Sequence, residues 1–204
     1  MRIVFDCVSL TFGNRRLFYG LTAEFVSGRI AAILGANGSG KSTLLKLAGQ
    51  FIEPDGGAIT AFDGDRELDR AEFRRRLAAT APAMNLYARL TAEENLQFFS
   101  KMRGAAIDDV DALFERVGLK RDDRKKFVGE FSTGMLQRLK FAILPAAGAD
   151  VWLLDEPGAN LDEGGRSMML EETKRAASEG RLIMLATNDP IEAAIADDQL
   201  RLGG

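Results

Sequence analysis

The sequence predicts an α/β fold: a mainly parallel sheet with helices, an antiparallel part at its N-terminal end and a helical insertion in its middle. Three observations lead to this prediction. Strand and helix patterns alternate near both ends of the chain, helical patterns fill the middle, and the first thirty residues alternate in the manner of antiparallel strands. We expect a single domain, in which residues 1–82 and 148–204 form the α/β core and residues 83–147 the helical insertion.

The N-terminal segment is expected to form antiparallel strands. Apolar side chains recur at every second position in two stretches, with Gly13-Asn14 as a turn between them: Ile3, Phe5 and Cys7, and then Leu21, Ala23 and Phe25. The pattern predicts that Cys7 is a small buried residue. Because Cys7 is the only cysteine, the sequence excludes a disulfide framework and a cysteine-based metal cluster.

Residues 35–42 match the phosphate-binding pattern G-x-x-x-x-G-K-[ST] at every fixed position. The match lies between a predicted buried strand at 29–34 and a predicted helix at 41–48. Glycines let backbone N–H groups point at phosphate oxygens, Lys41 adds a positive charge near the β- and γ-phosphates, and the Ser42 hydroxyl can bind Mg²⁺. The sequence therefore predicts a nucleoside triphosphate site formed by Gly35, Ala36, Asn37, Gly38, Ser39, Gly40, Lys41, Ser42 and Thr43.

Helical patterns cover much of the middle of the chain, at residues 91–102, 108–117 and 132–144. Thr91, with Glu94 three residues later, forms a capping box that marks the start of the first of these helices. Strand and helix patterns then alternate again, with strands at 151–154 and 182–186 and helices at 163–178 and from Pro190.

A pair of acids follows the predicted strand at 151–154. In an α/β sheet, residues at the carboxyl ends of the strands meet at the crevice where ligands bind. We expect Asp155 to hold Mg²⁺, directly or through water, and Glu156 to orient or deprotonate the attacking water. Such a pair alone is more often a solvated strand end, and the phosphate loop upstream is what favours the catalytic interpretation.

Composition excludes several functions. A net charge of −3 argues against a general nucleic-acid binder, and no apolar run is long enough to cross a bilayer. The chain contains no histidine, which excludes histidine-based metal sites and imidazole acid–base chemistry. Together with the single cysteine, these features fit a protein of the reducing cytoplasm.

Between the phosphate loop and the acid pair, residues 131–138 read Phe-Ser-Thr-Gly-Met-Leu-Gln-Arg at the start of a predicted helix. With the three motifs in this order, the chain resembles the ATP-binding cassette family of transport ATPases, whose signature reads L-S-G-G-Q. Thr133 and Met135 replace the family's Gly and Gln. The resemblance covers the whole chain and implies a P-loop NTPase core with a RecA-like parallel sheet, an N-terminal antiparallel β subdomain and an inserted α-helical subdomain.

The resemblance also implies roles for residues outside the phosphate loop. Phe12 would stack on the adenine of ATP, and Asp162 would lie at a dimer seam. Two copies would pair head to tail, so that one signature closes over the γ-phosphate held by the other copy, through Ser132, Thr133, Gly134 and Met135. A separate integral-membrane permease would supply the transport pathway, with the ATPase at the cytoplasmic face of the membrane, itself not inserted, and with no nucleic-acid partner.

The sequence departs from the family pattern at two places. The family's glutamine at the join between core and helical insertion is replaced by Pro82 or Ala83, neither of which can ligate a metal. Asn85 could reach in from nearby, although it is more simply a turn residue. The family's switch histidine is replaced by Asn188, which can donate a hydrogen bond to a γ-phosphate oxygen but cannot carry a proton. Either the site works with fewer contacts or hydrolysis is slow, and the intact Glu156 favours a working ATPase.

Three functional interpretations remain open at this point. The first is the ATP-hydrolysing subunit of a transporter, most similar to the heme-exporter type linked to cytochrome c maturation, although other exporters use similar subunits. The second is a soluble ATPase of an assembly complex with the same fold. The third is a degenerate partner in a heterodimer, which binds ATP without useful turnover.

Overall fold

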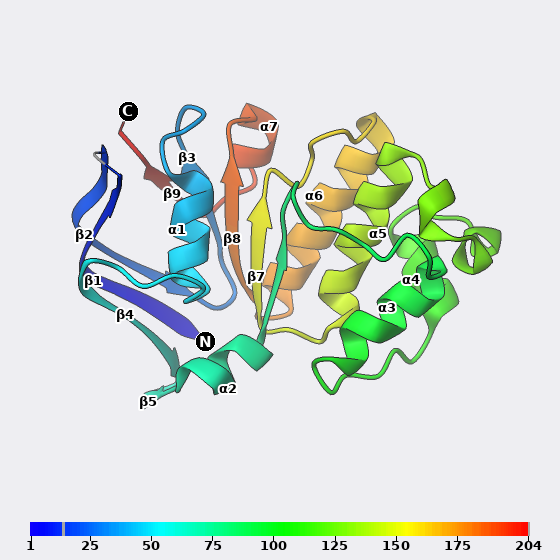
Figure 1. Cartoon of the computed structure of the whole chain (residues 1–204), viewed down its shortest axis with the longest axis horizontal. Coiled ribbons are helices and arrows are strands. Elements are labelled where there is room, and N and C mark those ends of the chain that lie inside the picture. Colours follow the sequence, from blue (N-terminus) through cyan, green and yellow to red (C-terminus); the bar gives the residue numbers. More distant parts are fainter. Residues whose placement is uncertain (14, 204) are drawn as a thin grey trace.

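The computed structural model describes residues 1–13 and 15–203 and contains two sheets, with most of the helices beside the second (Figure 1). The antiparallel sheet has the order β2-β1-β4-β5. Its strands are β1 (Arg2–Phe12), β2 (Arg15–Val26), β4 (Gly56–Asp63) and β5 (Arg66–Glu67). The second sheet is parallel throughout and has the order β6-β7-β8-β3-β9. Its strands are β6 (Leu77–Thr80), β7 (Val151–Asp155), β8 (Leu182–Thr187), β3 (Ile30–Leu34) and β9 (Asp198–Arg201).

Every helix predicted from the sequence is present, and α2 (Arg70–Arg75) is a helix that was not predicted. The others are α1 (Lys41–Ala48), α3 (Ala92–Lys101), α4 (Val110–Arg116), α5 (Thr133–Ala146), α6 (Glu163–Ser178) and α7 (Pro190–Ala193), with 3₁₀ turns η1 (Arg121–Lys125) and η2 (Val128–Glu130). The capping box of Thr91 and Glu94 is confirmed. None of the helices within residues 1–13 and 15–203 combines the length and the apolar character that crossing a bilayer requires.

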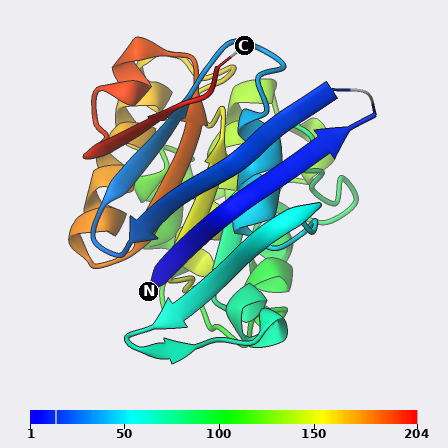
Figure 2. The ribbon, with the colours of Figure 1, turned by 90° about the vertical axis from the view of Figure 1, so that its left-hand side faces the viewer.

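The antiparallel sheet confirms the predicted pairing but corrects one residue. Ile3 pairs with Phe25 and Phe5 with Ala23, and Figure 2 looks directly onto these strands. After Phe5 an extra residue in β1 forms a bulge, and Cys7 takes a left-handed φ of 50°. Cys7 is therefore exposed, and Val8 occupies the buried position. The predicted turn at Gly13-Asn14 includes Asn14, which lies outside the described residues.

The parallel sheet is covered differently on its two faces, because successive strand residues point to opposite sides. Leu44 and Leu47 of α1 pack with Val151 and Leu153 of β7, which places α1 between the two sheets (Figure 1). The other face packs against α5 and α6 through Trp152 and its neighbours.

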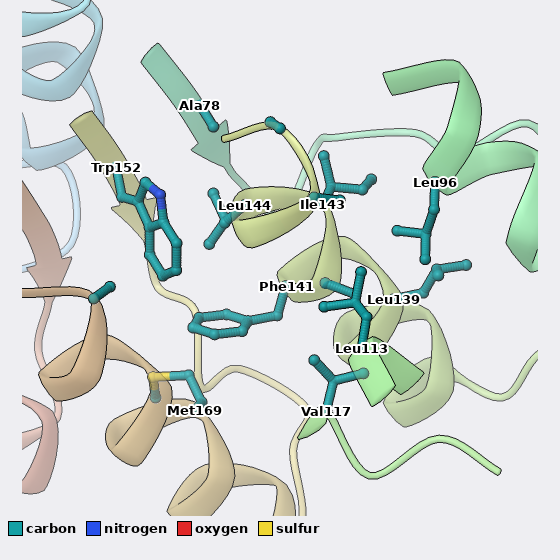
Figure 3. Packing of buried hydrophobic residues seen from close by; sticks show 14 of the residues in the cluster. Ala78, Leu96, Leu113, Val117, Leu139, Phe141, Ile143, Leu144, Trp152 and Met169 are labelled. Carbon is teal, nitrogen blue, oxygen red and sulfur yellow. The ribbon is translucent and has the colours of Figure 1, made fainter. Parts of the chain in front are cut away.

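A buried aromatic pair fixes α5 to β7. The rings of Phe141 and Trp152 meet edge to face with their centroids 6.0 Å apart, and Met169 of α6 lies beside them (Figure 3). All three side chains are buried, together with Leu139, two residues earlier on α5. Such pairs contribute about 0.5–1.5 kcal/mol beyond the area they bury. The helix that begins at the predicted signature is thus anchored on the strand that ends at the acid pair.

Candidate active site

The phosphate loop connects the fully buried strand β3 to α1, as the sequence predicts. Gly40, the residue before α1, has a φ of 103°. A Cβ atom at this position would also lie 3.0 Å from the Phe18 ring. Gly40 is therefore required both for its left-handed backbone and for the close approach of Phe18. The loop is closed by a hydrogen bond from the Ser39 N–H to the Ala36 carbonyl, 3.0 Å.

Lys41 lies folded against the loop that precedes it. Its Nζ donates to the carbonyl oxygens of Gly35 (2.8 Å) and Ala36 (3.3 Å), and it lies 4.0 Å from Glu156 Oε1. The side chain is only 5% exposed, so these acceptors compensate for the burial of its charge. The ammonium group is consequently held beside the loop, where it can exchange these acceptors for phosphate oxygens.

The acid pair lies across from Lys41, at the carboxyl end of β7. Asp155 is the last residue of the strand and pairs with Ala186 of β8. Glu156 has a φ of 46°, an unfavourable conformation for a residue other than glycine, and its N–H donates to the Ala186 carbonyl at 2.9 Å. This turn directs the chain out of the sheet and brings the Glu156 carboxylate toward Lys41.

One pocket, with a volume of about 540 Å³, joins these elements. Of the predicted site residues, it is lined by Phe12, Asn37, Gly38, Gly40, Lys41, Ser42, Thr43, Asp155 and Glu156. Sequence reasoning missed Arg15, Leu17 and Lys46, which also line it. Arg15 and Leu17 follow Phe12 in the predicted hairpin, which is the signal that could have identified them.

The pocket offers oxygen donors that suit Mg²⁺. The Ser42 hydroxyl and the Asp155 carboxylate both line it. Among residues 1–13 and 15–203, no group of three or more histidine, cysteine, aspartate or glutamate side chains is arranged so that it could hold a metal ion. One or two protein oxygens fit the way in which Mg²⁺ binds nucleotides, because its remaining ligands are phosphate oxygens and water.

Comparison with known proteins identifies the family. The sequence profile described as ABC transporter matches residues 18–159. The chain belongs to the ABC transporter family. It is 35% identical over 196 residues to the cytochrome c biogenesis ATP-binding export protein CcmA of Bradyrhizobium diazoefficiens, covering 94% of this chain and 93% of the relative. It is also 33% identical over 173 residues to the ABC transporter ATP-binding protein NatA of Bacillus subtilis, covering 82% and 69%.

Solved structures of ABC proteins share the fold. An ATP-binding subunit of an ABC transporter superposes with a TM-score of 0.88 at 24% identity, covering 99% of this chain and 86% of that chain. A dimeric cassette in a post-hydrolysis state, bound to ADP and Pi, superposes with a TM-score of 0.85 at 20% identity, covering 98% and 94%. The prediction of a P-loop NTPase α/β fold with an additional antiparallel sheet is therefore confirmed.

The predicted signature does not line the pocket of the phosphate loop in its own chain. Ser132 caps α5, where its Oγ accepts from the Met135 N–H at 3.3 Å. Gly134 faces the Asn160 carbonyl, 3.8 Å from where a Cβ would stand. None of the described residues Ser132, Thr133, Gly134 and Met135 lines the 540 Å³ pocket. The structure therefore does not bring this motif together with Lys41 and Glu156 within one chain.

Asp162, predicted to lie at a dimer seam, has structural contacts within its own chain. Its carboxylate accepts from the Gly165 N–H (2.8 Å), which caps α6, and from Arg138 of α5 (2.7 Å). These two donors hold the pKa of Asp162 below its usual value. Arg138 also donates to the Val117 carbonyl, so it ties the signature helix to both α4 and α6.

The two departures from the ABC pattern occupy different surroundings. Asn188 faces the phosphate loop, where its Nδ2 donates to Asn37 Oδ1 at 3.2 Å. Pro82, one of the two residues predicted to replace the family's glutamine, lines the 540 Å³ pocket. Asn85 lines a separate pocket with Lys140, so it does not replace that glutamine.

Proposed function

We propose that the chain is the ATP-binding and ATP-hydrolysing subunit of an ABC transporter that drives a separate membrane permease. The observation that carries the proposal is the convergence of Lys41, Ser42 and Glu156 in one pocket, with Asp155 beside them. In this proposal residues 1–82 and 148–204 bind and hydrolyse ATP, while residues 83–147 present the signature.

The proposed chemistry follows from these groups. The loop N–H groups and Lys41 bind the β- and γ-phosphates and orient the γ-phosphate for in-line attack. Glu156 accepts a hydrogen bond, and then the proton, from the attacking water. Ser42 and Asp155 would hold Mg²⁺, which when bound neutralises charge on the phosphates. In this proposal Asn188, whose Nδ2 donates to Asn37 of the phosphate loop, would donate to a γ-phosphate oxygen.

A head-to-tail dimer would complete the site. The signature residues Ser132–Met135 do not line the pocket of their own chain, and a second copy could supply them. The fold shared with a dimeric cassette bound to ADP and Pi supports this arrangement. Closure on ATP and opening after hydrolysis would then transmit work to the permease at the cytoplasmic face of the membrane.

The similarity to CcmA over nearly the full length of both chains supports a heme-exporter type of subunit. This assignment is tested by expressing the chain, with its own permease, in a bacterium that lacks CcmA. We expect c-type cytochromes to reappear on heme-stained gels, and Glu156→Gln to abolish the rescue. Failure of the wild type to rescue, with normal expression, would contradict the heme-export assignment.

The departures at Pro82 and Asn188 favour a second candidate, a degenerate partner that binds ATP without useful turnover. Steady phosphate release by the purified wild-type chain would exclude it.

Phe12→Ala is expected to weaken ATP binding by about 1–2 kcal/mol, the scale for a base stacked on an aromatic ring. The Phe12 side chain is 76% exposed at the rim of the pocket and so is free to stack. Tyr19→Ala, at an exposed aromatic that does not line the pocket, is the control. Titration with a fluorescent ATP analogue measures the effect, and equal affinities for all three proteins would reject the stacking role.

Asn188→Ala is expected to lower turnover about 10- to 100-fold, with a smaller change in ATP affinity. This corresponds to one hydrogen bond to a charged group, about 1.5–3 kcal/mol. Phosphate release at saturating ATP gives the turnover. Asn188→His tests the departure itself, since a higher rate would identify the asparagine as a compromise and a lower rate an adapted pocket. A wild-type rate in Asn188→Ala would mean that another residue senses the γ-phosphate.

A further inference from the structure

Glu192 of α7 is a buried acid that the proposed chemistry does not use. Its side chain is only 3% exposed, and its Oε2 atom is one of the buried polar atoms without a hydrogen-bond partner among the described residues. Burial raises the pKa of this carboxyl group, and the Thr187 hydroxyl and the Gly158 N–H oppose the shift. Burial of a carboxyl group with an unpaired oxygen lowers the stability of the folded state, so a function would explain why the chain retains it.

The side chain of Glu192 lies against the loop that leaves the acid pair. A Cβ atom added to Gly158 would stand 2.0 Å from Glu192 Oε1, so this close approach requires a glycine. Gly158 is two residues beyond Glu156, in a segment with a second left-handed non-glycine residue, Asn160, at a φ of 65°. A loop with two left-handed non-glycine residues keeps this conformation only when contacts with the surrounding structure stabilise it.

The same loop is held on its other side by the signature helix. Gln137 of α5, itself buried, donates from Nε2 to the Pro157 carbonyl at 2.8 Å. The turn at Pro157-Gly158 therefore lies between α5 and α7, in contact with Gln137 on one side and with Glu192 on the other. Figure 1 shows α7 at the upper end of β8, near the loop that leaves β7.

A second contact joins α7 to α6, the helix that begins where this loop ends. Asp189, which caps α7, pairs with Arg166 in the first turns of α6 at 2.8 Å. Asn188 immediately precedes Asp189. A shift of Asn188 toward a phosphate would thus carry α7 with it, and through Glu192 and Asp189 it would act on the loop that begins at Glu156.

We propose that Glu192 is a positioning residue for ATP turnover, which links the Asn188 segment to the Glu156–Asp162 loop by bracing Gly158. The inference rests on the proposed function, because it concerns turnover at the same site. Glu192 does not line the nucleotide pocket and acts through the backbone of the loop.

Glu192→Ala is expected to lower kcat for ATP about 10- to 100-fold, the scale for small displacements of reacting groups, while KM changes less than about twofold. Glu192→Gln should keep most of the activity, because an amide oxygen can still accept from the Gly158 N–H. Glu171→Ala, at an exposed position on α6, is the matched control and should turn over at the wild-type rate.

Gly158→Ala provides the second arm of the test. Its added methyl group should displace Glu192 and reproduce the loss of kcat, whereas in the Glu192→Ala background the same change should have little further effect. If the double variant instead loses kcat by the product of the two single-variant factors, the two residues act independently and the proposed contact is overturned. Should Glu192→Ala fail to fold, a wild-type kcat in Gly158→Ala would overturn the inference by itself.

Hydrogen exchange separates this inference from the proposed function. In the wild type, a non-hydrolysable ATP analogue should slow exchange of the backbone amides in residues 156–162, and Glu192→Ala should remove this protection while still binding the analogue. A wild type that hydrolyses no ATP would overturn the proposed function. Protection and kcat that are unchanged in Glu192→Ala would overturn only the role of Glu192.

Discussion

Glu156→Gln is expected to lower ATP turnover about 10²- to 10⁴-fold, the contribution typical of a positioned general base. The amide preserves the shape of the side chain and can accept a hydrogen bond, but it cannot take the proton of the attacking water. ATP affinity should change little, because Lys41 and the phosphate loop bind the phosphates. Phosphate release at saturating ATP measures the turnover, and a fluorescent ATP analogue measures the affinity.

The same variant tests the dimer. If hydrolysis is what separates two copies, Glu156→Gln should accumulate as a dimer with ATP and remain monomeric with ADP, as measured by light scattering. Glu171→Gln, on the exposed side of α6, serves as the control. Wild-type turnover in Glu156→Gln would reject the general base, and a monomer under saturating ATP would count against head-to-tail pairing.

Lys41→Ala is expected to weaken Mg·ATP binding by about 2–4 kcal/mol, or roughly 30- to 1,000-fold in Kd. The lysine is buried and already anchored to the Gly35 and Ala36 carbonyls, so its charge meets the phosphates in a partly dehydrated pocket. Lys174→Ala, an exposed lysine on α6, controls for the loss of one positive charge. Circular dichroism shows whether the variant stays folded. Unchanged affinity in a folded protein would reject the phosphate-loop assignment.

The sequence predicted the fold best where backbone and side-chain requirements coincide. At residues 30–48 three patterns indicate the same strand–loop–helix unit: a buried strand, a loop with glycines and an amphipathic helix. The structure has this unit as β3, the phosphate loop and α1. The strand β9 was missed because only one of its four residues, Leu200, is apolar. Periodicity also failed at Cys7, because a bulge adds one residue and inverts the alternation that the prediction relied on.

The site was predictable where one segment contains its own pattern and less so where separate segments meet. Arg15 lies in the hairpin after Phe12 and Lys46 lies on α1 after Ser42, and only the folded chain shows that both line one pocket. The sequence suggested that Asn85 could reach the site from nearby, but in the structure Asn85 lines a different pocket, together with Lys140. The burial of Glu192 likewise depends on how α7 sits against the loop after β7, which is a tertiary property.

The left-handed backbone at Glu156 has a consequence for how this chain can vary. A glycine or asparagine would adopt that φ more readily, by about 1 kcal/mol, and would thereby make the folded state more stable. Neither side chain could accept a proton from water. If Glu156 is the base that we propose, its replacement by glycine or asparagine therefore exchanges turnover for stability. Stabilisation of this ATPase by consensus or design has to be sought elsewhere in the chain, with residue 156 held fixed.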